Sequence, residues 1–200
     1  MTISGVLAWH PEVDMSPSEI DDFLPGRWVA RMATNGLDGY PAVTPLWYYW
    51  DGKCLYFNIA STRLTLRNLR RDPRCSVVID MDDRPLMGMR ANLAIAVMIA
   101  GDAELTSAGS GQQVTIEAGP FAGDYLPEEA LARILTRYGL TERDGAVGFS
   151  REAMGRLYQT EEIEGSLLKE DNADRVLVKI VPQRIRGWDF SKAPIGYLRE

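Results

Sequence analysis

Apolar and aromatic residues gather in short runs in the first half of the chain, and polar turn residues separate these runs. Such runs fit the pleated surface of a β-strand. Asp38-Gly39 and Asp51-Gly52 lie between them, and glycine supplies the positive φ that short hairpin turns need. The pattern therefore predicts two consecutive hairpins with strands over 28–34, 42–50 and 54–60, and a further strand over 75–80.

The remaining segments alternate between helical and extended patterns. Ser16 and Glu19 have the spacing of a capping box, which predicts a short helix that ends near Leu24. The stretch 93–106 predicts a long strand that bends at Gly101. In the second half we expect a loop over 107–123, helices over 127–138 and 150–159, and a strand over 175–181.

These elements predict a mainly β (α+β) fold, in which about six antiparallel strands form a small barrel around a short internal helix. The length of 200 residues is sufficient for one substantial core. We expect a single domain over 1–200, with an N-terminal helical arm over 1–26 and a helical insertion over 107–171.

Composition narrows the class of protein. Hydrophobic content of 46% and charged content of 25% are ordinary for a globular protein. The net charge of −6 argues against general binding to nucleic acid or to an anionic membrane. No apolar run is long enough to span a membrane, and the first residues lack the features of a secretory signal. As buried thiols, Cys54 and Cys75 favour a cytoplasmic location, with a disulfide between them as the minor alternative.

Several kinds of chemistry have no support in the sequence. His10 is the single histidine, and two dispersed cysteines do not make a zinc site, so we expect no metal. A surface position for His10 is favoured over a role as general base. The sequence has no nucleophile elbow, Walker loop or dinucleotide fingerprint. No catalytic residue can be named, and we expect the chemistry to belong to a bound cofactor.

A basic segment over 61–74 follows the third predicted strand and is predicted to be helical. Arg63 and Arg67 lie near its start, where backbone N–H groups already favour anions. This arrangement is typical of a phosphate site. The alternative is that the arginines form a solvated helix face or pair with acids across a dimer.

Four aromatic residues, 47–50, follow one another in the second predicted strand. Successive side chains of a strand face opposite sides, so one pair is expected in the core. The other pair then requires a dimer interface or a ligand ring, because exposed aromatic pairs are uncommon without a function.

The segment 31–80, with Thr44-Pro45-Leu46-Trp47 and the string RNLRRDPR at 67–74, resembles the FMN-binding split-barrel superfamily, the pyridoxamine 5′-phosphate oxidase-like proteins. The resemblance covers 28–106 and 172–190 and leaves 107–171 as an insertion. It implies a six-stranded antiparallel split β-barrel, a homodimer, and a flavin held in a groove between the two barrels.

Carried over position by position, the resemblance places the second strand beside the flavin ring and the end of the third strand near the ribityl phosphate. This chain has Leu64 and Thr65 where the family commonly has arginine and lysine. Arg63 and Arg67, one helical turn apart, can supply two cations instead. The residues implied to bind the cofactor are Val43, Thr44, Pro45, Leu46, Trp47, Asn58, Ile59, Arg63, Thr65, Arg67 and Trp188 of the partner subunit.

The function that the resemblance implies is that of an FMN-dependent oxidoreductase, which transfers hydride or electrons to or from a small organic substrate. An F420-dependent reductase on the same fold is the first alternative. A non-enzymatic flavin- or haem-binding protein and a cofactor-free dimeric binding module are the others. The insertion over 107–171 is expected either to cover the groove as a lid or to enlarge the dimer contact.

Overall fold

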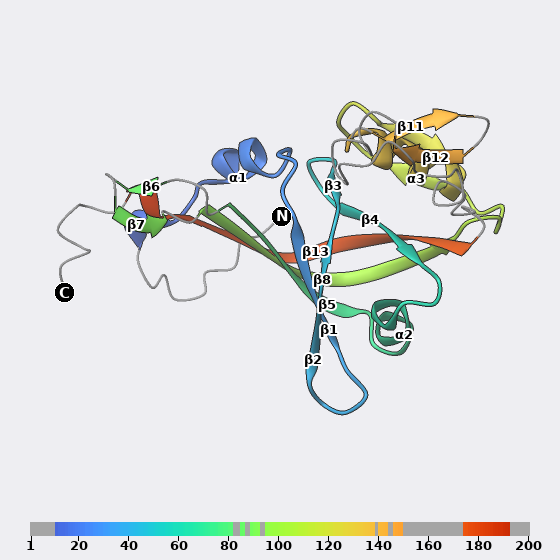
Figure 1. Ribbon diagram of the computed structural model, residues 1–200, viewed down its shortest axis with the longest axis horizontal. Helices are drawn as coiled ribbons and strands as arrows, with labels where there is room; N and C mark the ends of the chain where they lie inside the picture. The colour runs from blue at the N-terminus through green and yellow to red at the C-terminus, as the bar shows by residue number, and fades with distance from the viewer. Residues whose placement is uncertain are drawn as a thin grey trace, which may run out of the picture.

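The computed structural model describes residues 11–81, 85–86, 89–92, 95–138, 140–143, 146–149 and 174–192. Its centre is a curled antiparallel sheet of seven strands in the order β2-β1-β5-β8-β13-β4-β3 (Figure 1). The strands are β1 (Ala30–Asn35), β2 (Pro41–Leu46), β3 (Tyr49–Trp50), β4 (Leu55–Ala60), β5 (Arg74–Met81), β8 (Ile95–Ser107) and β13 (Arg175–Asp189). The predicted mainly β split barrel is confirmed, with one strand more than the predicted six.

The extra strand arises because the predicted strand 42–50 is two strands. β2 ends at Leu46 and β3 begins at Tyr49, and the two lie at opposite edges of the sheet. Only Trp47 and Tyr48 join them. A two-residue link can connect the two edges only if the sheet curls until they approach each other at this point. The crossover, as we call Trp47 and Tyr48, is therefore the point at which the barrel closes.

The two hairpin predictions are confirmed. β1 pairs with β2 across a turn that contains Gly39, and β3 pairs with β4 across a turn that contains Gly52. Both glycines have positive φ, 85° and 95° respectively, as such turns require.

The first two helices follow their sequence signals. α1 (Pro17–Phe23) begins with the predicted capping box, in which the Ser16 hydroxyl accepts from the Glu19 amide and the Glu19 carboxylate accepts from the Ser16 amide. α2 (Leu64–Arg71) packs Leu66 and Leu69 against the barrel interior. Short 3₁₀ turns, Pro11–Val13 and Phe190–Lys192, lie near the two ends of the described chain.

The long ribbon of β8 and β13 extends beyond the predicted strands. β13 runs to Asp189 instead of ending at 181, and it pairs with β8 along almost its whole length. At Gly101 a Cβ atom would lie 2.3 Å from the Val181 carbonyl oxygen, so only glycine fits this close approach. The register shifts between Pro182 and Arg184, opposite this glycine. Gly101 therefore lies opposite an irregularity of β13, and the predicted bend of the strand at Gly101 stays a prediction.

The inserted segment contributes more structure than was predicted. Its described elements are β9 (Val114–Ile116), β10 (Gly123–Tyr125), α3 (Pro127–Thr136), β11 (Leu140–Arg143) and β12 (Ala146–Phe149). β9 pairs with β10, so the prediction of a plain loop over 107–123 is wrong. The helix predicted over 127–138 is confirmed as α3. The helix predicted over 150–159 lies outside the described residues, as does His10. β6 (Pro85–Leu86) and β7 (Met89–Asn92) form a separate small hairpin.

Two separate clusters of buried apolar side chains stabilise the chain. The main core fills the inside of the barrel and includes Leu24, Met32, Tyr48, Trp50, Leu55, Phe57, Leu66, Leu69, Val77, Ile79, Val97, Ile99 and Val178. The second cluster lies between α3 and the other face of β4 and β13 (Figure 1). It consists of Tyr49, Cys54, Tyr56, Ile116, Ala130, Leu131, Ile134 and Leu177. The insertion therefore covers one part of the barrel's outer surface.

The four consecutive aromatic residues divide differently from the prediction of one buried pair and one exposed pair. Tyr48 and Trp50 enter the main core, Tyr49 enters the second cluster, and only Trp47 remains substantially exposed. The alternation of faces holds, but the second face is covered by the insertion. No pair of exposed aromatic rings is left on this strand.

Both cysteines are free and buried, so the minor alternative of a Cys54–Cys75 disulfide is wrong. Burial raises the pKa of Cys54 to about 11 and that of Cys75 to about 12, so both thiols are protonated at neutral pH. In the described part of the chain, no helix has the length and apolar character needed to cross a membrane.

Candidate functional site

The second strand and the basic helix meet at one edge of the barrel. The Thr44 and Thr65 hydroxyl groups form a hydrogen bond of 2.9 Å, which ties β2 to the first turn of α2. Val43 and Leu64, each next to one of these threonines, are more than half exposed. The structure thus brings together the two segments that were expected to bind the flavin ring and the phosphate, which lie some twenty residues apart in the sequence.

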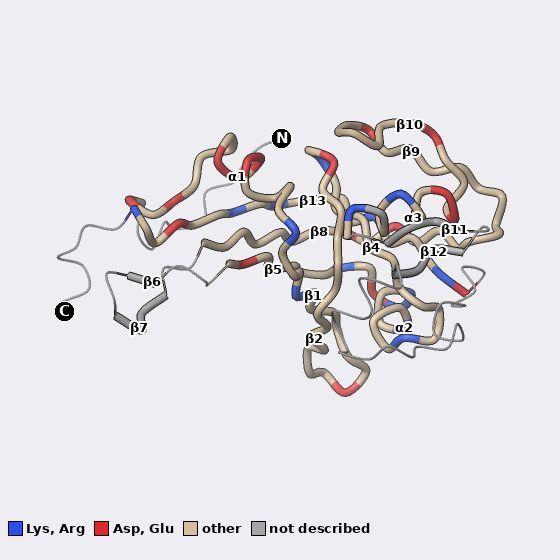
Figure 2. Tube along the Cα trace, turned by 45° about the horizontal axis from the view of Figure 1, so that its top comes forward, with Lys and Arg blue, Asp and Glu red and all other residues tan. Residues whose placement is uncertain are grey.

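The arginines of α2 divide into two groups. Arg70 donates to the Ser61 carbonyl, and Arg71 donates to the Asn35 carbonyl at 2.5 Å. By contrast, Arg63 and Arg67 are exposed and pair with no acidic side chain of the described residues. No side chain caps the N-terminus of α2 at Arg63, so this end presents both helix-dipole and side-chain positive charge. Basic positions of α2 are blue in Figure 2.

A third cation, Arg175, lies at the same end of the barrel. It begins β13 and stands opposite Ala60, the last residue of β4, directly before the turn that leads to Arg63. Partial burial lowers the pKa of Arg175, and the positive charge of Arg63 lowers it further. No motif or spacing along the chain points to Arg175, because it lies 112 positions from Arg63 and only the sheet order brings the two together.

Three predicted site residues lie in positions that restrict what they can contribute. Ile59 is 2% exposed and packs in the main core, so its side chain faces away from any surface groove. Thr65 is buried with its hydroxyl bonded to Thr44. Asn58, beside them at the end of β4, has a buried Oδ1 atom with no hydrogen-bond partner.

Trp188 lies far from this site within one chain. It pairs with Ala96 near the far end of the β8–β13 ribbon and bridges to Asp14, on the side of α1 (Figure 1). α2 lies at the opposite side of the molecule. A contact between Trp188 and the α2 site therefore requires a second copy of the chain.

The outer face of the barrel between these two ends is open. A shallow cavity of about 800 Å³ spans β1, β5, β8 and β13 there. Its floor is made of small side chains, Ala33, Ser76 and Ala100, and its sides carry Arg74 and Arg184. A flat surface of small residues offers little chemistry of its own, but it allows another backbone or a flat ligand to come close.

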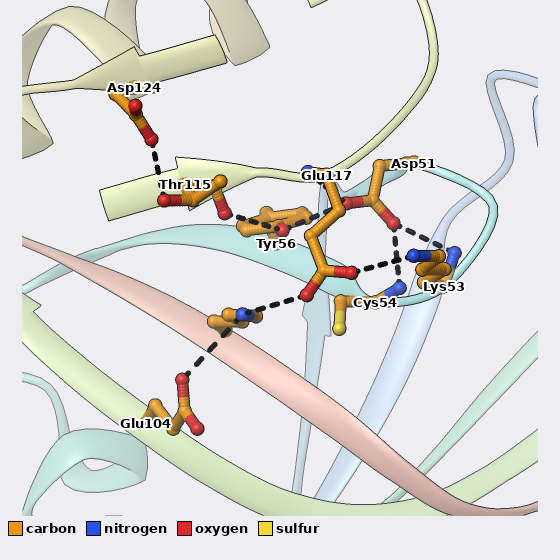
Figure 3. A network of polar contacts seen from close by, with 9 residues as sticks. Asp51, Lys53, Cys54, Tyr56, Glu104, Thr115, Glu117 and Asp124 are labelled. Atoms are coloured by element: carbon orange, nitrogen blue, oxygen red, sulfur yellow. Dashed lines mark hydrogen bonds and ion pairs between the residues drawn. The ribbon is translucent and has the colours of Figure 1, made fainter. Parts of the chain in front are cut away.

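The insertion is attached to the barrel by a buried carboxylate. Asp51, 3% exposed, accepts hydrogen bonds from the amides of Lys53 (2.8 Å), Cys54 (2.7 Å) and Glu117 (3.2 Å) and from the Tyr56 hydroxyl (2.8 Å) (Figure 3). Burial and the neighbouring Asp51 charge raise the pKa of Tyr56 far above its usual value. The Lys53 ammonium pairs with the Glu117 carboxylate at 2.9 Å. These contacts fix β9 beside the turn between β3 and β4.

This network has a structural role and is not a metal centre. The described residues contain no group of three or more His, Cys, Asp and Glu side chains that could hold a metal ion. Lys179 extends the network between Glu104 and Glu117, at 3.8 Å from each. Every acid at its centre is balanced by a donor or a cation, so the network stabilises the insertion and leaves no reactive group.

Known structures share this architecture. A conserved hypothetical protein from Mycobacterium tuberculosis matches with a TM-score of 0.55 and 26% identity, over 92% of this chain and 90% of that one. A protein described as an F420 reductase matches with a TM-score of 0.52 and 19% identity, over 82% and 94%. An FAD-binding protein from Mesorhizobium loti matches with a TM-score of 0.52 and 16% identity, over 88% and 94%.

The sequence itself matches a family model. The model described as pyridoxamine 5′-phosphate oxidase covers residues 16–120, which is more than half of the chain and includes β1 to β5 and α2. The matched region contains the junction of β2 and α2, whereas α3 and β13 lie outside it. With the curled seven-stranded sheet, this match shows that the chain belongs to the pyridoxamine 5′-phosphate oxidase family of split-barrel proteins.

Proposed function

We propose that this chain is a flavin-dependent oxidoreductase that binds FMN at the edge of the barrel where β2 meets α2. The observation that carries the proposal is the convergence of three features at this edge. They are the exposed cations Arg63 and Arg67, the third cation Arg175 nearby, and the exposed apolar side chains of Val43 and Leu64. A cofactor with an anionic phosphate and a flat apolar ring requires this combination.

The phosphate end would lie at the start of α2. Leu64 is exposed and Thr65 is buried, so the two positions where the family commonly has cations supply none. Arg63 and Arg67 are on one face of the helix and can each bind phosphate oxygens in a bidentate manner. The uncapped N–H groups of the first turn would add further donors. The residues present therefore fit a phosphate, although they differ from the usual set.

The ring end would lie along β2. β2 is an edge strand that pairs only with β1 among the described strands, so one side of its backbone is available to a ligand. On this open side Val43 can offer both N–H and C=O, whereas Pro41 and Pro45 offer only C=O; the groups of Thr44 and Leu46 point toward β1. Hydrogen bonds from this edge would orient the polar rim of the ring, and Val43 and Trp47 would cover its apolar surface.

We propose that the functional unit is a homodimer. Two observations support this: Trp188 lies too far from α2 to serve the site of its own chain, and the open face of β1, β5, β8 and β13 carries small side chains. A second copy packed on that face could bring Trp188 of the partner subunit to the α2 end. Light scattering at micromolar concentration would test the proposal, and a monomer mass would contradict it.

When bound, FMN supplies hydride or electron transfer to or from a small organic substrate. None of the residues named for the groove carries a carboxylate, thiol or imidazole group. The chain's own contribution would thus be to bind the cofactor, to orient it and to exclude water from one face of the ring. The Val43 N–H on the open side of β2 would stabilise negative charge that develops on the ring.

The proposal is tested by titrating the apo-protein with FMN and with F420 while flavin fluorescence is recorded. Arg63→Ala should raise the Kd for FMN about tenfold or more, because a charge-assisted contact to phosphate is lost. Arg70→Ala is the matched control, since Arg70 is on the same helix and already bonds to the Ser61 carbonyl. Tight binding of F420 with weak binding of FMN would favour the deazaflavin alternative. Failure to bind either cofactor would contradict the proposal.

A further inference from the structure

The crossover leaves two backbone groups without strand partners. Trp47 and Tyr48 belong neither to β2 nor to β3, so no ladder pairs the Tyr48 N–H and C=O. Tyr138, the second residue after α3, supplies both missing contacts through a single hydroxyl. The hydroxyl accepts from the Tyr48 N–H at 2.9 Å and donates to the Tyr48 carbonyl at 2.7 Å. The Tyr138 hydroxyl thus supplies the hydrogen bonds that a neighbouring strand would otherwise make with Tyr48.

The ring of Tyr138 makes a second contact with the crossover. It stacks on the indole of Trp47 with centroids 4.8 Å apart and an interplanar angle of 9°. Trp47 is still 40% exposed after this contact, so part of the indole remains reachable from outside. One tyrosine therefore fixes both the backbone and the exposed side chain of the crossover.

A neighbouring residue ties the same point to the N-terminal arm. Arg137 donates to the carbonyl oxygens of Pro25 and Gly26, and its guanidinium lies 5.6 Å from the centre of the Tyr48 ring. The Tyr48 hydroxyl in turn donates to the Leu24 carbonyl at 2.7 Å. Three segments that are distant in sequence therefore meet at the crossover, and the end of α3 holds them together.

We propose that Tyr138 is a positioning residue for the cofactor groove, which holds Trp47 as an aromatic wall for a flat conjugated ring. The inference rests on the proposed function, because Trp47 follows directly on the part of β2 proposed to line the ring. Tyr138 lies outside the residues 16–120 that match the family model. The insertion would therefore give this chain a means of setting ring affinity that the matched region does not contain.

Loss of the Tyr138 hydroxyl should weaken the binding of the flavin ring, with or without a phosphate. Tyr138→Phe keeps the ring but removes both hydrogen bonds to Tyr48, so the indole of Trp47 loses its fixed position. We expect the Kd for lumiflavin, which has the ring and no phosphate, to rise about fivefold to tenfold. The Kd for FMN should rise by the same factor, because the phosphate contacts are unaffected. Arg63→Ala should weaken the binding of FMN and leave the binding of lumiflavin unchanged, which separates phosphate contacts from ring contacts.

Tyr125→Phe is the matched control. Tyr125 is also in the insertion, and its hydroxyl donates only to the nearby Ala122 carbonyl. Its affinity for both ligands should equal that of the unaltered protein. A double-mutant cycle then tests whether Tyr138 acts through Trp47: in a Trp47→Ala background, Tyr138→Phe should change the lumiflavin Kd less than about twofold.

Hydrogen exchange measures the crossover without any ligand. The Tyr48 amide should exchange about tenfold faster or more in Tyr138→Phe than in the unaltered protein, whereas the amides of β1 and β5 should keep their protection. Equal exchange at Tyr48 would overturn the inference. The inference would also be overturned if the unaltered protein and the Tyr138→Phe variant bound lumiflavin equally well. If the unaltered protein binds neither FMN nor lumiflavin, the proposed function and the role of Trp47 as a ring wall are both overturned. If it binds flavin and Tyr138→Phe has no effect, only the inference about Tyr138 is overturned.

Discussion

The main core and the second cluster are both apolar and deeply buried, yet neighbouring segments are held in place differently in the two regions. In the main core, long antiparallel ladders fix the register, with β8 and β13 alone paired over thirteen positions. In the second cluster, the insertion depends on a few side chains that bond to backbone groups, chiefly Asp51 and Tyr138. Many equivalent backbone hydrogen bonds hold the strands of the barrel in register, whereas a few individual side chains attach the insertion to the barrel.

This difference has a functional consequence. The proposed cofactor edge is built from the ladder-held barrel, but its exposed aromatic residue, Trp47, is positioned by the insertion. Substitutions in the insertion can therefore adjust the groove without disturbing the strands beneath it.

The largest expected loss of stability comes from two matched alanine substitutions, each of which leaves a cavity in one of the two clusters. Ile99 in the main core and Ile134 in the second cluster are both fully buried, so the same change to alanine removes the same group from each region. Each should lower the free energy of unfolding by about 3 kcal/mol, as measured by urea denaturation. Ile99→Ala should raise hydrogen exchange throughout the sheet, while Ile134→Ala should raise it mainly in α3 and at Tyr48.

The exchange patterns decide whether the regions are independent. Two different patterns would mean that the second cluster can open while the barrel stays folded. If both variants loosened the sheet equally, the two clusters would form one cooperative unit, and the contrast between them would be wrong.

A smaller effect is expected where the two regions join. Asp51→Asn keeps the shape of the side chain but turns an amide donor toward groups that are themselves donors. We expect a loss of about 2 kcal/mol in unfolding free energy, with faster exchange at the Glu117 amide. Asp124→Asn is the control: its carboxylate is exposed and accepts from the Thr115 hydroxyl at 2.6 Å, so its loss should stay within about 0.5 kcal/mol. Similar losses in the two variants would contradict the central role of Asp51.

The smallest effect concerns alkaline pH. Burial raises the pKa of Cys75 from 9.0 to about 12, so folding favours the thiol form. The corresponding stability is complete below the ordinary pKa and is lost as the pH rises through the interval up to the raised one. The urea midpoint should therefore stay level up to about pH 8.5 and fall from about pH 9 to about pH 11, and it should fall less steeply in Cys75→Ala. Parallel slopes for the two proteins would show that other buried groups, such as Tyr48 and Tyr56, account for the sensitivity.

Local signals in the sequence predicted much of the barrel. The turns at Gly39 and Gly52 and the capping box at Ser16 each depend on a few neighbouring residues, and all are present in the structure. The family resemblance, carried by the strand around Thr44 and by the basic helix, is confirmed by the family match. Turns and helix caps could thus be predicted from the sequence, because they depend on the chemistry of neighbouring residues.

The break between β2 and β3 was not predicted. Residues 42–50 form one continuous apolar and aromatic run, and nothing in its periodicity marks Trp47 and Tyr48 as the link between opposite edges of a sheet. The hairpin of β9 and β10 was also missed, because Gly- and Ser-rich sequence around it is typical of loops. In both cases the partner that makes the segment a strand lies elsewhere in the fold.

The fold class, the family and the cationic start of α2 could be predicted from the amino-acid sequence, because hairpin turns, helix caps and helix dipoles act over a few residues. The proximity of Arg175 to Arg63 and the contact of Tyr138 with Trp47 arise from tertiary packing alone. Each of these pairs joins segments about ninety or more residues apart, which meet because the sheet order and the packing of α3 place them together. Contacts of that kind have no periodicity along the chain, since they depend on how whole elements pack.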